Sequence, residues 1–164
     1  SIRRQRQMCI RDSNMSGAYS YEQAIEVTRK IVTSKLNNAL EQIFRRAIFN
    51  IIGRNQDDHT KNISYLMDKN GKWSLSPAYD LTYSYNPTGG FTSKHQMSVN
   101  GKRDQFDIDD LFKLGEKADL TKRKMNKIID EVKGVFNRWD EYALEAKVSG
   151  PHTEKVSKGL RLDL

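Results

Sequence analysis

Two aspartates and an asparagine are the residues whose types and spacing best fit chemistry. Asp57 precedes Asn62 by five positions in the polar segment RNQDDHTKNISYL, and Asp80 follows further along the chain. Carboxylate and amide oxygens are ligands that Mg²⁺ prefers, and a carboxylate can also orient a hydroxyl group and accept its proton. Phosphoryl transfer needs both kinds of group beside the transferred phosphate. The three residues are therefore candidates for that chemistry.

Three interpretations of the polar segment compete. It can be a solvated connection, because short polar side chains bond to nearby backbone in such loops. It can be a metal site of Asp57, Asp58 and His59, although consecutive residues rarely converge on one ion. It can be a phosphoryl-transfer site of Asp57 and Asn62, in which case Asp58 faces solvent or assists the metal. For a single polar loop, the solvated connection is the most frequent of the three.

The order of the elements favours phosphoryl transfer. Protein kinases place Asp-x-x-x-x-Asn on a loop after a helix, followed by a hairpin and a second metal-binding Asp. Here Asp57 and Asn62 follow a helix with an apolar stripe, a hairpin comes next, and Asp80 follows the hairpin. We expect the three side chains to converge on one cleft, with oxygens of Asn62 and Asp80 within about 3 Å of each other around Mg²⁺.

Apolar periodicity and capping signals predict the helices that position these residues. Ser20 and Gln23 have capping-box spacing, which predicts a helix start. Gly53 is placed to end the next helix, at a position that favours positive φ. That helix carries an apolar stripe: Leu36, Leu40, Ile43, Phe44, Ala47, Ile48 and Ile51. Further helices are predicted over 108–117, after a Thr121 N-cap, and around 154–160 beyond a break at Gly150-Pro151.

The segment between the helices predicts a small hairpin and a long loop. The β-prone runs Ile63–Met67 and Lys72–Ser76 flank an Asn70-Gly71 pair, which favours a tight turn. Residues 82–106 are rich in Thr, Ser, Gly, Asn and Tyr without a clear period, which predicts a surface loop. The fold class is therefore mainly α (α+β), helical with a small β-hairpin after the candidate site.

Composition limits the class of protein. A chain of 164 residues, 37% hydrophobic and 30% charged, is typical of one globular domain. No apolar run is long enough to span a membrane. The single cysteine, Cys9, excludes an internal disulfide and a Cys-based zinc site, which fits a reducing cytoplasm.

The net charge of +7 indicates nucleic-acid binding only weakly, because much of it lies at the N-terminus. Residues 1–13 hold four arginines and one aspartate, so the rest of the chain carries +4. The bases that would encode Met8 to Ser13 resemble a transposon-derived sequencing adapter. We therefore interpret residues 1–13 as a non-native leader and residues 14–164 as the domain.

The motifs NQDDHTKN and SPAYDLTYSYNP resemble the C-terminal region of HipA-like serine/threonine kinases, the toxins of bacterial toxin–antitoxin pairs. SYEQ, FRRAIFNIIGRN and KHQMSVNGKRD fit the same pattern, so the resemblance runs from Asn14 to Trp139. It implies a protein-kinase-like C-terminal lobe with ATP as substrate and Mg²⁺ as cofactor. The implied roles are Asp57 as catalytic carboxylate, Asn62 and Asp80 as Mg²⁺ ligands, His59, Thr60 and Lys61 at the nucleotide phosphates, and Tyr79 beside the nucleotide.

The resemblance also implies partners, and the chain departs from the family pattern in one respect. A HipA-like kinase modifies a protein of the translation apparatus in the cytoplasm and is restrained by a HipB-like DNA-binding antitoxin, through which it contacts DNA indirectly. Such kinases carry a Gly-rich phosphate loop and a Lys in an N-terminal part, but Gly17 and Gly53 are the only glycines before Asp57. We therefore expect half of a kinase site. The alternatives are a non-catalytic helical module that docks an antitoxin–DNA complex, and a nuclease that uses Asp57, Asp58 and Asp80.

Overall fold

Helix α2 (Leu36–Ile52) is the axis of the fold, which the computed structural model describes over residues 17–164. The leader predicted over residues 1–13 lies outside the described residues. Leu36 of the predicted apolar stripe of α2 is only partly buried, and the other six residues are fully buried: Leu40, Ile43, Phe44, Ala47, Ile48 and Ile51. Because each such side chain stabilises the fold by about 1.5–3 kcal/mol relative to an exposed one, α2 holds the core together.

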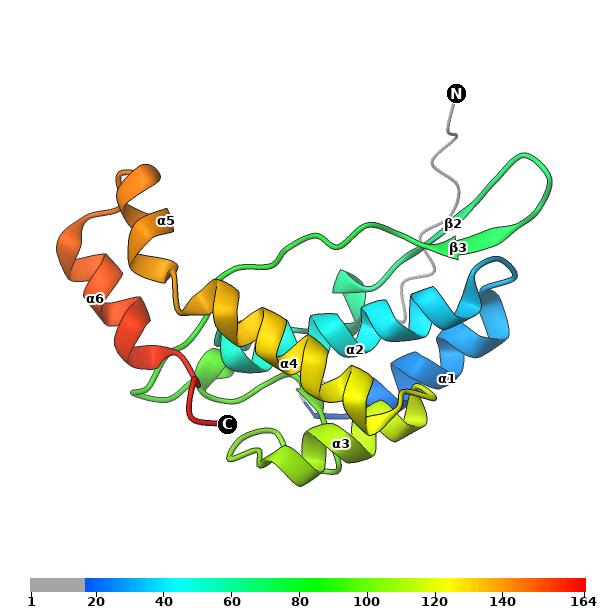
Figure 1. Ribbon diagram of the computed structural model, residues 1–164, viewed down its shortest axis with the longest axis horizontal. Helices are drawn as coiled ribbons and strands as arrows, with labels where there is room; N and C mark the ends of the chain where they lie inside the picture. The colour runs from blue at the N-terminus through cyan, green and yellow to red at the C-terminus, as the bar shows by residue number, and fades with distance from the viewer. Residues whose placement is uncertain (1–16) are drawn as a thin grey trace.

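The other helices pack around α2 or extend from it (Figure 1). α1 (Tyr21–Ile31) and α4 (Lys122–Phe136) contact α2, and α3 (Ile108–Lys117) packs against all three of them. α5 (Trp139–Glu145) and α6 (Gly150–Gly159) pair with each other at one end of the molecule, away from the β-hairpin at the opposite end. None of the helices in residues 17–164 combines the length and apolar character that a membrane span requires.

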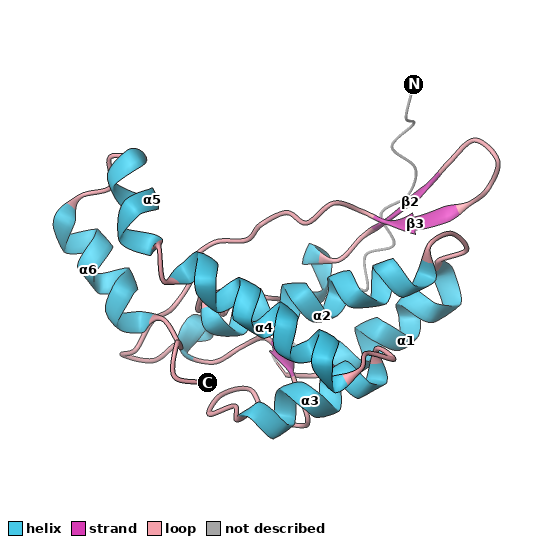
Figure 2. Ribbon diagram, in the orientation of Figure 1, coloured by secondary structure: helices cyan, strands magenta, loops and turns pink. Residues whose placement is uncertain are grey.

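Side-chain caps fix where the helices begin. The Ser20 hydroxyl accepts from the Gln23 N–H, and the Gln23 side chain accepts from the Ser20 N–H, which confirms the predicted capping box of α1. Thr121 caps α4 by accepting from the Lys124 N–H, again as predicted. The predicted helix over Ile108–Lys117 is α3. The mainly α fold with a small β-hairpin is therefore confirmed (Figure 2).

The predicted hairpin is formed by β2 (Tyr65–Met67) and β3 (Trp73–Leu75), which pair antiparallel. Its turn is wider than a two-residue turn, because the Asp68 N–H donates to the Lys72 carbonyl and the Asp68 carboxylate accepts from the Lys72 N–H. Gly71, at φ 77, supplies the left-handed backbone that this turn needs. The hairpin carries the chain away from the candidate site and back to it.

Residues 82–106 are not a surface loop throughout, which corrects the prediction. Their middle contains a 3₁₀ turn, η2 (Phe91–Ser93), and the short strand β4 (Met97–Ser98), which pairs in parallel with β1 (Tyr19–Ser20). His95 and Met97 are buried. The polar composition of residues 82–106 suggested exposure to solvent. Buried polar groups are nevertheless stable when partners distant in the sequence satisfy them.

Gly53 ends α2 as predicted, but for a different physical reason. Its φ is −78, and the left-handed residue at this turn is Arg54, at φ 55. A Cβ at position 53 would lie 2.3 Å from Cζ of Phe136. Glycine is needed because α4 packs closely against the end of α2, not because of its backbone freedom.

Gly150 and Pro151 open α6 instead of breaking the chain before it, so the last helix begins four residues earlier than predicted. Proline is favoured in the first turn of a helix, because the N–H that it lacks would have no partner there.

Candidate active site

The end of α2 delivers the DDHTKN loop (Asp57–Asn62) beside the chain that follows the hairpin. The backbones at Asn55 and Ser84 pair as a parallel bridge. The Asn55 side chain donates to the backbone carbonyl of Asp80 at 3.0 Å, and it is almost fully buried. These contacts bring Asp80 to the loop, as the order of helix, loop, hairpin and acid predicts.

Asp57 is the aspartate of the loop that remains available for chemistry. Its side chain is 39% exposed, yet Oδ1 is enclosed and accepts no hydrogen bond from the described residues. Burial raises the pKa of Asp57; His59, whose Nε2 lies 3.8 Å from Oδ1, opposes this effect, and the charge of Asp80 adds to it. A raised pKa makes the carboxylate a better proton acceptor, as a general base requires.

Asn62 and Asp80 line one small cavity of about 10 Å³, and Asp57 lies beside it. The Asn62 amide nitrogen donates to the Asp57 carbonyl at 3.2 Å, which leaves the amide oxygen for a ligand. The two oxygen donors fit Mg²⁺, and a cavity of this size has room for about one water or ion. Within residues 17–164, no three His, Cys, Asp or Glu side chains are placed to hold a metal ion. A metal here would therefore depend on the Asn62 amide, and its ligation stays a prediction.

Asp80 occupies a strained part of the backbone. Its φ is 56, in the left-handed region that a residue with a side chain adopts at a cost of about 1–3 kcal/mol. The bond from Asn55 to the Asp80 carbonyl holds this conformation. Strain of this kind concentrates at functional sites, where the surrounding structure enforces it.

Asp58 belongs to the interior, which corrects the expectation that it faces solvent; it lines the small cavity with Asn62 and Asp80, and its assistance to a metal stays a prediction. It is 1% exposed. Its Oδ2 accepts from the Tyr21 hydroxyl at 2.9 Å and lies 2.8 Å from Nδ1 of His95, and its Oδ1 accepts from the Gln96 backbone N–H at 2.7 Å. The three-residue metal site and the nuclease both need Asp58 as a ligand, and the carboxylate is already committed to these donors.

The other predicted site residues lie in two places. His59 and Tyr79 line the small cavity, and the Tyr79 hydroxyl donates to the Lys61 backbone carbonyl, which ties Tyr79 to the loop. Thr60 lines a separate groove, and the Lys61 side chain is exposed. Phosphate contacts for His59, Thr60 and Lys61, and a nucleotide contact for Tyr79, stay predictions.

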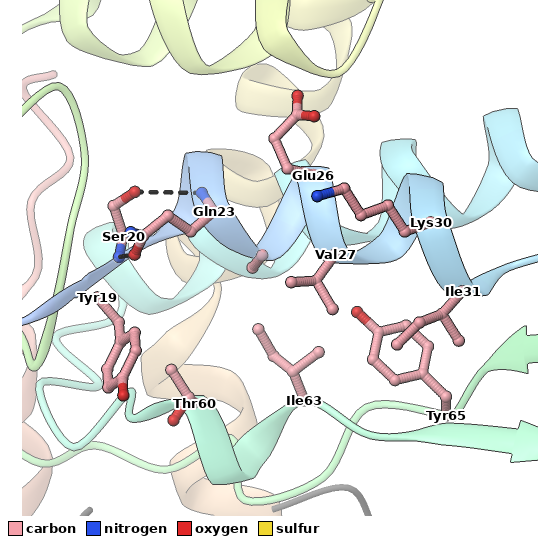
Figure 3. A pocket seen from close by; sticks show the side chains of 11 residues that line it. Tyr19, Ser20, Gln23, Glu26, Val27, Lys30, Ile31, Thr60, Ile63 and Tyr65 are labelled. Carbon is pink, nitrogen blue, oxygen red and sulfur yellow. Dashed lines mark hydrogen bonds between the residues drawn. The ribbon is translucent and has the colours of Figure 1, made fainter. Parts of the chain in front are cut away.

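The separate groove is mainly apolar, with a volume of about 370 Å³ (Figure 3). Val27 and Ile31 from α1 face Ile63 and Tyr65 across it, and Thr60 lies at one end. Residues of the DDHTKN loop thus line both the small cavity and the apolar groove.

Arg46 is a charged residue of the small cavity. It is 8% exposed, and its Nη2 donates to the Ser76 carbonyl. Nε and Nη1 are enclosed and have no hydrogen-bond partner among residues 17–164, and no acid in that range forms an ion pair with Arg46. Burial lowers the pKa of Arg46. A buried cation without an acid partner is costly.

The two adjacent aspartates give opposite expectations for stability. Because the folded-state pKa of Asp57 is raised, the folded state binds this proton more tightly than the unfolded state does. The carboxylate therefore costs stability as pH rises through the raised pKa, and costs none below the unfolded pKa of about 3.9. Asp57→Asn should raise the urea midpoint of the chain at pH 7 and leave it unchanged near pH 3.

Asp58→Asn is the matched control, with the same chemical change one residue away. It removes the charge that accepts buried hydrogen bonds from Tyr21 and Gln96, so it should lower the free energy of unfolding by more than about 1.5 kcal/mol at pH 7. Equal destabilisation by both substitutions would contradict the distinct environments described for Asp57 and Asp58.

Fold and site together define the class: a mainly helical domain that presents an aspartate and an asparagine on a loop, and a second aspartate after a hairpin, beside one cavity. The family model of the HipA-like C-terminal domain matches residues 5–139. The chain belongs to this family. No curated protein matches it.

Proposed function

We propose that this chain is the catalytic C-terminal lobe of a HipA-like protein kinase, which transfers the γ-phosphate of ATP to a serine or threonine hydroxyl. The observation that carries the proposal is the position of Asn62 and Asp80 on one cavity with Asp57 beside it. Membership of the HipA-like C-terminal family supports it.

Asp57 acts as the catalytic carboxylate in this proposal. It orients the attacking hydroxyl of the substrate protein and accepts its proton as the bond to phosphorus forms. The partly exposed carboxylate can be reached, its Oδ1 has no competing hydrogen bond among the described residues, and its raised pKa favours proton transfer.

Asn62 and Asp80 would hold Mg²⁺, which, when bound, bridges the phosphates of ATP and neutralises their charge. Arg46 adds positive charge on the wall of the same cavity. His59, Thr60 and Lys61 are assigned to the nucleotide phosphates and Tyr79 to the nucleotide, since they belong to or contact the DDHTKN loop.

Substrate and partner follow from the family. The protein substrate belongs to the translation apparatus, the restraining partner is a HipB-like DNA-binding antitoxin, and both act in the cytoplasm. Any contact with DNA is made through the antitoxin.

Residues 14–164 by themselves should show no detectable kinase activity. No Gly-rich phosphate loop precedes Asp57 in the sequence. Positioning and charge neutralisation supply most of the catalysis in phosphoryl transfer, and ATP would have only one side of the cleft. Transfer from radiolabelled ATP to bacterial lysate proteins, and to the chain itself, measures this.

The positive control is a parent enzyme in which this lobe follows an N-terminal lobe with the Gly-rich loop and the Lys. Robust phosphorylation by residues 14–164 would contradict the two-lobe account. A folded parent that transfers no phosphate to any lysate protein or to itself would contradict the kinase proposal.

A further inference from the structure

The segment after α6 folds back onto the inner side of the candidate site. The Arg161 N–H donates to the carbonyl of Ile52, at the end of α2, at 3.0 Å. The Arg161 guanidinium is 11% exposed, forms an ion pair with Asp104 and lies 5.3 Å from the centre of the Phe106 ring. Burial and the neighbouring charge of Arg54 lower the pKa of Arg161 to about 10, so it remains a cation at neutral pH.

Arg161 and Asp58 together determine which nitrogen of His95 carries the proton. His95 is fully buried, and its Nε2 lies 3.1 Å from Nη1 of Arg161. A guanidinium can only donate, so Nε2 must accept. The proton of the neutral ring is therefore on Nδ1, which donates to Oδ2 of Asp58 at 2.8 Å. The edge of the ring packs against Phe106, and its centre lies 5.3 Å from that of Phe106.

Asp58 connects the His95 tautomer to the position of the DDHTKN loop. Its carboxylate is held by His95, the Gln96 N–H and the Tyr21 hydroxyl, and Asn50 donates in turn to that hydroxyl at 2.8 Å. Asp58 directly follows Asp57 in the chain, so the anchored Asp58 side chain fixes the backbone that carries Asp57.

We propose that Arg161 is a positioning residue, which reinforces the Nδ1–H tautomer of His95 that Asp58 also requires and thereby holds Asp58 and the loop in place. In the opposite tautomer, the lone pair of Nδ1 would face the Asp58 carboxylate, and one hydrogen bond would become a repulsion. The structural part of this role is independent of the kinase proposal. Its effect on catalysis rests on that proposal.

The test is ¹⁵N NMR of the histidine side chains in the 164-residue chain at pH 7. Wild-type His95 should show a protonated Nδ1 and an unprotonated Nε2. In Arg161→Met, Nε2 should gain a proton, and the Gln96 amide should exchange about fivefold faster or more, the change that one lost hydrogen bond produces. Arg161→Lys, which keeps a cationic donor, should restore part of both.

Asp104→Asn is the matched control, because it removes the ion pair of Arg161 but leaves the contact between Arg161 and His95. It should leave the His95 tautomer unchanged. A protonated Nε2 in the wild-type chain overturns the proposal, and so does a folded Arg161→Met in which the His95 tautomer and the exchange rate of the Gln96 amide are both unchanged. An identical tautomer change in Arg161→Met and Asp104→Asn also overturns it.

In the parent enzyme, Arg161→Met should lower kcat about fivefold and change the KM for ATP less, because Asp57 adjoins Asp58 in the chain while Asn62 lies four residues away. An equal change in kcat and KM would contradict positioning through Asp57. If the parent proves not to be a kinase, the tautomer and exchange measurements still decide the role of Arg161.

Discussion

Asp57→Asn in the parent enzyme is expected to lower turnover by about 10² to 10⁴, the usual contribution of a proton-transfer group. The substitution keeps the shape of the side chain but removes the charge that orients the attacking hydroxyl and accepts its proton. ATP affinity should barely change, because Asp57 lies beside the cavity of Asn62 and Asp80 and is not expected to hold the metal. Steady-state turnover and ATP titration of the same preparation measure the two quantities.

The neighbour of Asp57 supplies the control for this result. Asp58→Asn also removes one negative charge, yet its effect should be seen first in stability, because Asp58 is buried. If Asp57→Asn retains normal turnover in a folded parent enzyme, the assignment of the catalytic carboxylate is wrong.

Asp80→Asn should lower both ATP binding and turnover, because it removes a charged ligand of Mg²⁺. Raising the Mg²⁺ concentration should restore part of the binding in this variant and none of the turnover lost in Asp57→Asn. ATP titrations at several Mg²⁺ concentrations, on both variants, separate the two roles. If Asp57→Asn loses ATP while Asp80→Asn binds it normally, the two carboxylates have been assigned the wrong way round.

Local signals in the sequence predicted the frame of the site. The apolar stripe of α2, the Ser20 capping box, the Thr121 cap and the hairpin before Asp80 each depend on residues close together in the chain. These elements bring Asp57, Asn62 and Asp80 to the candidate site, in that order along the chain. The motifs NQDDHTKN and SPAYDLTYSYNP, which contain these residues, resemble the HipA-like family, and the family model confirms that resemblance.

The features that sequence reasoning missed depend on distant contacts. Asp58 is buried because its partners lie at positions 21, 95 and 96, and the spacing of a single loop carries no information about them. Gly53 is required by Phe136, a contact between two helices that no local rule for helix ends describes. Arg46 lies on α2, which the sequence defines mainly by its apolar stripe, and it lines the small cavity.

The residues around Asp58 are far apart in the sequence, so the ribosome makes them at different times. The ribosome makes α1, α2 and the DDHTKN loop first, at about 5–20 residues per second. The donors of Asp58 at His95 and Gln96 follow later, and Arg161 is added roughly 5 to 20 seconds after Asp58 at that speed. The loop therefore lacks its full set of contacts while the chain is growing. The contacts that hold Asp58 are thus completed only after almost the whole domain has been synthesised.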